Sequence, residues 1–134
     1  MVNIASHIPG FVHRSPSRYA AYHRLIAQSR FTLCPRGFGP TSFRLYETLA
    51  LGSIPIYIWD DFPWLPYEDK LDWARLALIL QASDLDRLPE LIQSTTDDQQ
   101  QNILDYAASH FDNYFSYPGV CEQIATQLDR LAHP

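Results

Sequence analysis

The sequence predicts an α/β domain of three layers, in which helices cover both faces of a small parallel sheet. Three short apolar runs, at residues 31–34, 54–59 and 76–80, have the length of buried strands. Stretches whose apolar residues recur at helical spacing lie before, between and after these runs. Strands that alternate with helices favour parallel pairing, and 134 residues suit a single domain, residues 1–134, with one hydrophobic core.

Hydrophobic periodicity is weak in the first fifteen residues and clear in the residues that follow. Residues 1–15 show no clear period and contain the turn signal Pro9-Gly10, so we expect irregular structure or one short fourth strand there. Residues 17–28 carry aromatic and aliphatic side chains at helical spacing, which predicts a helix. The strand that follows stops at Pro35, because proline cannot continue a ladder.

The middle of the chain predicts a helix, a buried strand and a loop. Residues 41–51 have a helical period and end at Gly52, a residue type that commonly terminates helices. Residues 54–59 follow as a buried strand, in which Pro55 is tolerated because it stands near the start. Residues 60–70 combine prolines with aromatic and acidic side chains, which indicates an ordered loop.

The C-terminal part is predicted to be helical after the third apolar run. Ser83 opens a short helix, and residues 97–115 form the longest predicted helix, with acids in its first turn. Pro118-Gly119 is expected to break the chain before a last helix. Apolar side chains line one face of each of the last two helices. We expect both faces to pack into the core, with an interface to a further domain as the alternative for one of them.

Composition argues against several classes of function. The formal net charge of −5 and the pI near 5.4 disfavour a surface that binds nucleic acid or anionic membranes, since both need a basic face. No run approaches the roughly 18 apolar residues of a membrane span, so the chain is expected to be soluble. Cys34 and Cys121 match no zinc or redox spacing, which predicts two free thiols. The compartment stays open, and free thiols are compatible with a bacterial cytoplasm.

The candidate binding residues lie between the first strand and the next helix: Arg36, Gly37, Gly39, Thr41, Ser42, Arg44 and Glu47. A strand end, two glycines two residues apart and hydroxyl residues at a helix start predict an anion site, because the first amides of a helix lack intrahelical partners. The glycine spacing alone is also explained by a structural turn, since it matches neither the dinucleotide fingerprint nor the P-loop.

Two arginines and one carboxylate give this site its predicted chemistry. Arg36 and Arg44 flank the helix start, and their forked donors suit the oxygens of a diphosphate. Glu47 follows Arg44 by three residues and is placed to accept hydrogen bonds from ribose hydroxyls. The alternative for Arg44 and Glu47 is a helical ion pair that stabilises the helix by about 0.2–0.5 kcal/mol.

The loop after the second strand offers further candidates. Asp60, at the carboxyl end of a strand, is a candidate contact for the sugar or the acceptor, with loop solvation or helix capping as alternatives. The pair Asp60-Asp61 supplies too few ligands for a hard metal ion, and the histidines show no metal-ligand spacing, so no metal site is predicted. Trp64 and Tyr67 fit either a ligand wall or packing, whereas Trp73 is expected to pack in the core.

Several separated blocks of sequence extend this pattern. They are Tyr22-x-x-Leu25-x-x-x-Ser29-Arg30-Phe31-x-Leu33-Cys34-Pro35-Arg36-Gly37, Ser42-x-Arg44-Leu45-x-Glu47 followed by Gly52-x-Ile54-Pro55, Leu65-Pro66-Tyr67, Leu71-Asp72-Trp73 and Asp84-Leu85-x-x-Leu88. In order, spacing and residue type they resemble the exostosin family of glycosyltransferases over roughly residues 22–92.

The resemblance implies a Rossmann-like domain, as in the C-terminal half of a two-domain GT-B glycosyltransferase, which holds a nucleotide sugar, commonly a UDP-sugar. It also implies that Arg36, Ser42, Arg44 and Glu47 contact this donor, and that no metal cofactor is required. The expected reaction transfers a sugar from a nucleotide-diphospho sugar to a glycan or another hydroxyl acceptor. These residues do not assign the catalytic base.

The length of the chain bears on how such an enzyme would work. A GT-B enzyme uses an N-terminal domain for much of its acceptor site, and 134 residues leave no room for one. We therefore expect a truncated piece of a longer enzyme, a partial gene product or a domain that works with a partner, and the absence of the N-terminal domain is a reason for inactivity of the chain alone. The alternatives are a module that binds a nucleotide sugar or a glycan without turnover, and a subunit that stabilises a catalytic partner.

Overall fold

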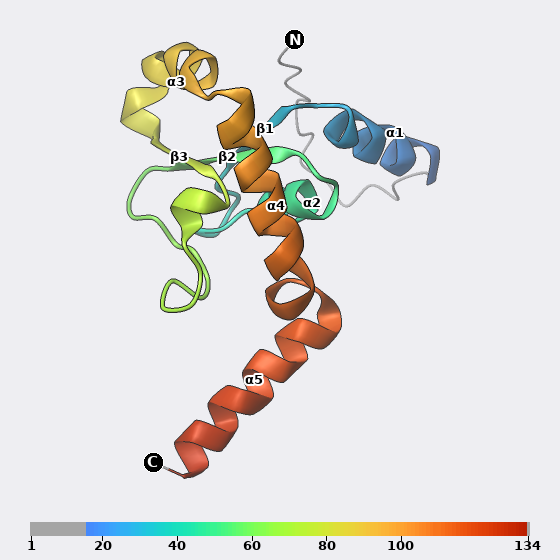
Figure 1. Cartoon of the computed structure of the whole chain (residues 1–134), viewed down its shortest axis with the longest axis vertical. Coiled ribbons are helices and arrows are strands. Elements are labelled where there is room, and N and C mark those ends of the chain that lie inside the picture. The colour runs from blue at the N-terminus through green and yellow to red at the C-terminus, as the bar shows by residue number, and fades with distance from the viewer. Residues whose placement is uncertain (1–15, 134) are drawn as a thin grey trace.

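A computed structural model of the chain describes residues 16–133 and contains a parallel sheet of three strands in the order β1-β2-β3 (Figure 1). The strands are β1 (Phe31–Pro35), β2 (Ile54–Trp59) and β3 (Leu78–Gln81). Phe31 pairs with Ile54 at one end of the sheet, and Trp59 pairs with Gln81 at the other, so the carboxyl ends of the strands share one edge. The predicted α/β class and the small parallel sheet are confirmed.

Five α-helices and two 3₁₀-helices accompany the sheet between residues 16 and 133. They are α1 (Pro16–Ala27), α2 (Phe43–Ala50), η1 (Trp73–Arg75), η2 (Ala82–Arg87), α3 (Leu88–Ser94), α4 (Asp97–Tyr114) and α5 (Tyr117–Ala132). The helices predicted at residues 17–28, 41–51 and 97–115 correspond to α1, α2 and α4. The alternation of strands and helices is that of a Rossmann-like domain. The fourth strand considered for residues 1–15 falls outside the described residues.

The main core lies on one face of the sheet, under α2 and α4. Tyr57 of β2, Cys34 of β1 and Leu45 of α2 are fully buried in it. Ala107 contributes from α4, and Trp73 packs into the same cluster with 5% of its surface exposed, as predicted. The small and aliphatic side chains let the helices approach the strands, and the large rings fill the remaining space.

The opposite face of the sheet borders a hollow of about 1060 Å³. Phe31, Leu33 and Pro35, which alternate along β1, line it together with Thr32 of the same strand and Ile56 of β2. Residues of α1 and α3 supply its walls. The hollow therefore separates α1 from α3 on this face, whereas α2 and α4 pack against the other.

Two element starts differ by two residues from the sequence prediction. The third strand starts at Leu78 rather than at Leu76, because Leu76 and Ala77 follow η1 into the core, where each is 1% exposed. The second helix starts at Phe43, because Ser42 has extended backbone angles and serves as the N-cap. Leu76, Ala77 and Ser42 therefore each have a structural role, but they lie one or two positions outside the element that was predicted to contain them.

The break before the last helix falls at Phe115 and Ser116, and Pro118-Gly119 lies inside the first turn of α5. Proline is favourable there because the first amides of a helix have no intrahelical partner to lose. Ser116 caps the helix by accepting a hydrogen bond from the Gly119 amide at 3.1 Å. Gly119 is buried against the backbone of α4, so the two helices meet closely at this turn.

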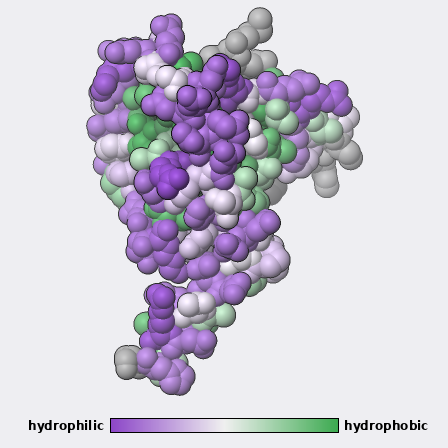
Figure 2. All heavy atoms as spheres, in the orientation of Figure 1, coloured by the Kyte–Doolittle hydropathy of each residue, from purple (hydrophilic) through white to green (hydrophobic). Residues whose placement is uncertain are grey.

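Beyond this turn, α5 extends away from the sheet and from the other helices (Figure 1). Ile124, Leu128 and Leu131 are 55%, 61% and 71% exposed, so the prediction that this stripe packs into the core is wrong for the part of the chain described. Hydrophilic side chains cover most of the visible surface, and α5 stands apart from the body (Figure 2). An apolar stripe shows that a face is suited to burial, but it does not show which element covers that face.

The two thiols are free, as predicted, and lie in different environments. Cys34 is buried and Cys121 is exposed. Burial raises the pKa of the Cys34 thiol to about 11, against a smaller opposing effect of its hydrogen bond with the Thr48 hydroxyl. Among the helices described, none has both the length and the apolar composition that crossing a bilayer requires.

Candidate functional site

The loop of residues 36–42 joins β1 to α2 at the carboxyl edge of the sheet. The Arg36 amide donates to the Ile58 carbonyl at 3.2 Å, which extends the β1–β2 ladder. The Gly37 amide donates to the Thr41 carbonyl at 3.0 Å, which closes the loop. Ligands of open parallel sheets bind outside the carboxyl ends of the strands, so the loop lies where such a site is expected.

The two glycines of this loop leave space rather than permit an unusual turn. Neither Gly37 nor Gly39 has a positive φ, whereas Gly52 does, at 72°. A Cβ at Gly37 would meet the Thr41 carbonyl oxygen at 3.5 Å, and one at Gly39 would meet no atom within 4 Å. The backbone of the loop therefore does not require glycine at either position. The missing side chains leave the loop backbone open, as the close approach of an anion requires.

Two buried or half-buried tyrosines hold the end of the loop. The hydroxyl oxygen of Tyr57 accepts a hydrogen bond from the Trp64 amide at 3.0 Å. The same hydroxyl group donates to the carbonyl oxygen of Pro40 at 3.2 Å. The hydroxyl groups of Thr41 and Tyr46 lie 3.2 Å apart. Because Tyr57 is fully buried in the sheet, the loop is tied directly to the core.

The start of α2 has amides that no side chain caps. Ser42 is the N-cap residue, with φ −130° and ψ 126°, but its hydroxyl makes no capping hydrogen bond. Its carbonyl accepts from the Leu45 amide at 3.1 Å. The first amides of a helix have no intrahelical partner, and together they carry a partial positive charge. The start of α2 therefore remains available to an anion.

Arg36 is bound to both carboxylates of the loop after β2. Its Nη1 lies 2.8 Å from Asp60 Oδ1 and 2.8 Å from Asp61 Oδ2. The guanidinium holds the pKa of Asp60 below its usual range, and hydrogen bonds to Asp60 and Asp61 raise the pKa of Arg36. Since Pro35 pairs with Ile58, the residues that follow the two strands meet at the same edge. Arg36 and Asp60, predicted separately, are thus one cluster.

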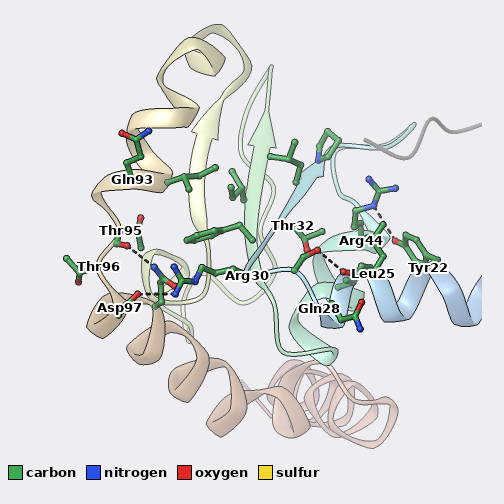
Figure 3. Close-up of a pocket in the computed structure, with 18 residues that line it drawn as sticks. Tyr22, Leu25, Gln28, Arg30, Thr32, Arg44, Gln93, Thr95, Thr96 and Asp97 are labelled. Atoms are coloured by element: carbon green, nitrogen blue, oxygen red, sulfur yellow. Dashed lines mark hydrogen bonds and ion pairs between the residues drawn. The ribbon is translucent and has the colours of Figure 1, made fainter. Parts of the chain in front are cut away.

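Arg44 and Glu47 are linked through a third residue, Tyr22 of α1. The Tyr22 hydroxyl donates to Glu47 Oε2 at 2.6 Å, and Arg44 Nε donates to the Tyr22 oxygen at 3.3 Å, as Figure 3 shows for Arg44 and Tyr22. The Arg44 guanidinium also lies 5.8 Å from the centre of the Tyr22 ring. No direct ion pair joins Arg44 to Glu47, although both lie in the described part of the chain. The alternative of a helical ion pair is therefore not the arrangement found.

The hollow over the second face of the sheet receives only part of the predicted site. Arg44 and Tyr22 line it on one side, and Arg30 and Asp97, which form an ion pair at 3.1 Å, lie on the other (Figure 3). The residues that line the hollow do not include the glycine loop, Arg36 or Asp60. The predicted residues thus form two groups, one at the strand ends and one where α1 meets α2, and Arg44 is the member that reaches the hollow.

The aromatic residues of the loop after β2 separate into packing and exposed groups. Tyr67 has a φ of 58° and packs against Tyr114 with tilted rings whose centroids lie 5.2 Å apart. The indole N–H of Trp73 donates to the Pro66 carbonyl at 2.7 Å, so Trp73 is held in the core. Trp64 is 43% exposed, and only its backbone is engaged by Tyr57. Trp64 therefore has a face free for a ligand, as does Phe62 of the same loop, which is 58% exposed.

The described residues bring no group of metal ligands together. Within residues 16–133, no set of three or more His, Cys, Asp or Glu side chains lies close enough to hold a metal ion. His7 and His13 fall outside the described residues. The expectation that no metal is required stays a prediction.

Three residues of the site carried no assigned role in the sequence analysis. Asp61 could have been assigned to Arg36, since both follow neighbouring parallel strands. Tyr57 could have been flagged as well, because a hydroxyl inside a buried strand needs a hydrogen-bond partner. Tyr22 stands in the first block of the family pattern, but nothing in that pattern assigned it a role or a partner. Twenty-five positions separate it from Glu47, and no local pattern pairs a residue of α1 with one of α2.

Residues 3–95 match the exostosin GT47 domain, and the chain belongs to this family. It is similar to an exostosin-1 homolog of Caenorhabditis elegans, with 36% identity over 93 residues, which cover 69% of this chain and 24% of the relative. It is also similar to a probable glucuronoxylan glucuronosyltransferase of Arabidopsis thaliana, with 37% identity over 76 residues, covering 57% and 17%.

The match to a third relative is also partial. A probable glucuronosyltransferase of Oryza sativa subsp. japonica is 41% identical over 68 residues, which cover 51% of this chain and 16% of the relative. The chain thus spans about a quarter or less of the length of these curated relatives. The match to the family includes the glycine loop, α2 and the acidic loop, and it ends before α4 and α5.

Proposed function

We propose that this chain is the donor-binding part of a glycosyltransferase that moves a sugar from a nucleotide-diphospho sugar to a hydroxyl group of a glycan or another acceptor. One observation carries the proposal. An uncapped helix start, an open loop backbone and Arg36 lie at the carboxyl edge of a parallel sheet, and Arg44 lies in the first turn of the same helix, in a member of the exostosin family.

The diphosphate of the donor is the group that this edge suits best. The amides of Phe43 and Arg44 at the start of α2, next to Thr41 and Ser42, supply donors for which the described residues offer no partner. Arg44 supplies a half-buried guanidinium, and Arg36 supplies a second one that now contacts Asp60 and Asp61. A departing nucleoside diphosphate gains negative charge, and donors already held in position stabilise that charge.

The ribose is assigned to Glu47. Its Oε2 accepts the hydrogen bond from Tyr22, and among the described residues Oε1 has no partner. A carboxylate with one free oxygen can accept hydrogen bonds from the ribose hydroxyls. Asp60 and Trp64 follow β2 at the same edge of the sheet, and they remain the candidates for contact with the sugar or the acceptor.

The donor that we expect is a UDP-sugar, bound without a metal ion because arginines neutralise the phosphates. Two of the plant relatives are named as glucuronosyltransferases, which favours UDP-glucuronic acid as the first complete donor to test. The acceptor domain and the catalytic base are assigned to a further domain or chain.

Calorimetry with UDP, in the presence of a metal chelator, tests the proposal. The unmodified chain should bind, and Arg44→Ala should lose most of its affinity, since a charged hydrogen-bond partner of phosphate contributes about 1.5–3 kcal/mol. Arg24→Ala on α1 is the matched control, because Arg24 is exposed and belongs to neither group of the site. Retained affinity in Arg44→Ala, with an unchanged melting temperature, would remove Arg44 from the site.

A binding module without turnover is the second candidate, and one observation favours it. Asp60 and Asp61 are the carboxylates nearest the strand ends, and both are held by Arg36, which leaves neither as an obvious base. An assay for release of UDP from UDP-glucuronic acid separates the candidates. Release above the uncatalysed rate, by the chain alone or together with a domain that supplies the acceptor site, fits the enzyme. Binding without release in both cases fits the module.

A further inference from the structure

We infer that Tyr22 is a positioning residue of the donor site, whose hydroxyl group keeps Glu47 and Arg44 apart and turned toward the ribose and the diphosphate. The inference rests on the proposed function, since it concerns the same site. It assigns a role to a residue of α1, an element outside the strand-loop-helix that was predicted to bind the donor. In this role Tyr22 acts on the ligand only through Glu47 and Arg44.

The geometry places one hydroxyl group between two charged groups. The distance from the Tyr22 oxygen is 2.6 Å to Glu47 Oε2 and 3.3 Å to Arg44 Nε. A tyrosine hydroxyl has a single proton. Because that proton is given to the carboxylate, the oxygen is left to accept from the guanidinium. The two bonds therefore have fixed directions, and together they set the orientation of both side chains.

The contacts with Tyr22 leave the Nη groups of Arg44 and the Oε1 atom of Glu47 available to a ligand. Tyr22 occupies only the Nε of Arg44, and no other hydrogen bond of the two Nη groups is found among residues 16–133. It occupies only Oε2 of Glu47. The fork of Arg44 can therefore meet phosphate oxygens, and Oε1 can meet a ribose hydroxyl, while the Tyr22 contacts remain.

The environment keeps the hydroxyl group in its donating form. Tyr22 is half-buried, and desolvation raises the pKa of its phenol, with a further increase from the hydrogen bond to Glu47. The nearby Arg44 opposes these effects to a smaller extent. The phenol thus stays protonated at neutral pH, and the arrangement does not change over the range in which an enzyme would work.

Without the hydroxyl group, Arg44 and Glu47 have an alternative. They stand three positions apart on α2, which is a spacing that allows a direct ion pair. Such a pair would use the guanidinium and the carboxylate on each other, and both would turn away from the ligand. Tyr22 prevents this by offering each side chain a better-placed partner. Its role is therefore to hold two groups in a competent arrangement, which no contact within α2 can do.

Calorimetry on the full 134-residue chain tests the inference with two ligands, UDP and 2′-deoxy-UDP. In the unmodified chain, UDP should bind more tightly than 2′-deoxy-UDP, because Glu47 contacts a ribose hydroxyl. Tyr22→Phe removes only the oxygen atom. It should weaken UDP binding by about tenfold and reduce the preference for UDP over 2′-deoxy-UDP to about twofold or less.

Tyr19→Phe is the matched control on the same helix. Tyr19 is 42% exposed, and its hydroxyl makes no hydrogen bond within the described part of the chain, so both affinities should stay as they are. The melting temperature of each variant shows whether the fold is kept. A general loss of structure would weaken both ligands equally, whereas a loss of positioning weakens UDP more than 2′-deoxy-UDP.

The outcomes separate the two proposals. If the unmodified chain binds neither ligand, the proposed function fails and the inference fails with it. If the chain binds UDP, and Tyr22→Phe leaves both the affinity and the preference unchanged, only the inference is overturned. It is also overturned if the unmodified chain binds the two ligands equally, since Glu47 then makes no contact for Tyr22 to orient.

Discussion

The hydroxyl group of Tyr57 lies 3.2 Å from the carbonyl oxygen of Pro40 and thereby joins the centre of the sheet to the loop that precedes α2. The same oxygen accepts a hydrogen bond from the Trp64 amide in the loop after β2. One buried side chain thus holds two loops at the carboxyl edge, where the candidate site lies. Its removal should affect stability and ligand binding together.

Tyr57→Phe should therefore lower the free energy of unfolding by about 1–3 kcal/mol, because it leaves the Trp64 amide without its partner in a half-buried place. UDP affinity should fall as well, since the loop that ends at Pro40 loses its link to the sheet. Urea unfolding and calorimetry measure the two effects. Tyr117→Phe is the control, because Tyr117 is 86% exposed and should change neither. A variant with normal stability would contradict this account.

The pair formed by Arg36 and Asp60 predicts a dependence of stability on pH. The pKa of Asp60 in the folded protein is lowered by Arg36 from its ordinary value of 3.8. The pair therefore stabilises the fold above that ordinary value, and its contribution is lost as the pH falls through the lowered folded pKa. The effect should be small, because Asp60 and Arg36 are partly exposed to solvent.

Melting temperatures measured from about pH 6 down to pH 2 check this sign. Asp60→Asn should lower the melting temperature slightly at pH 6, and the difference from the unmodified chain should shrink as the pH falls. Asp129→Asn on the exposed part of α5 is the control, and it should run parallel to the unmodified chain. A difference that grows toward low pH would show that Asp60 does not have the lowered pKa.

The two cysteines should differ in reactivity toward a thiol-specific disulfide reagent. Cys34 is fully buried and its pKa is raised to about 11, so at about pH 8 it is a protonated thiol that the reagent does not reach. Cys121 is exposed on α5. One thiol should react in the native protein and a second only after denaturation. Rapid labelling of a Cys121→Ser variant would contradict the burial of Cys34.

Gly119→Ala tests the junction between α4 and α5. A methyl group there would overlap the backbone of Asp112 and Asn113, so α5 would have to shift. Overpacking of this kind destabilises by about 1–3 kcal/mol, and urea unfolding followed by circular dichroism would show the loss. Gly39→Ala is a contrasting change, because a Cβ at that position meets no atom within 4 Å. Equal stability of both variants would show that the junction is not closely packed.

The sheet could be predicted because its strands are short apolar runs bounded by proline or by polar and charged residues. The run that begins at Leu76 shows the limit, since apolar character alone does not distinguish a residue of β3 from one that packs in the core just before it. The stripe of α5 shows another limit. Periodicity predicted the helix correctly, but which element covers a stripe depends on tertiary structure that no local pattern contains.

The candidate site could be predicted in part for the same kind of reason. Arg36, Arg44 and Glu47 stand at fixed distances from a strand end and a helix start, so local spacing was enough to select them. The partners they meet come from elsewhere. Asp61 reaches Arg36 through the register of β1 and β2, and Tyr22 reaches Glu47 only through the packing of α1 on α2. Contacts of this second kind require the fold.

The extension of α5 has a consequence for how cooperatively this chain unfolds. Residues 124–132 are all exposed, so that part of the helix is stabilised by little more than its own backbone bonds, and isolated helices of that length are marginal in water. The tryptophans at positions 59, 64 and 73 all report on the sheet and its loops. Helix content and tryptophan fluorescence should therefore melt along different curves, and a single two-state transition should not describe both.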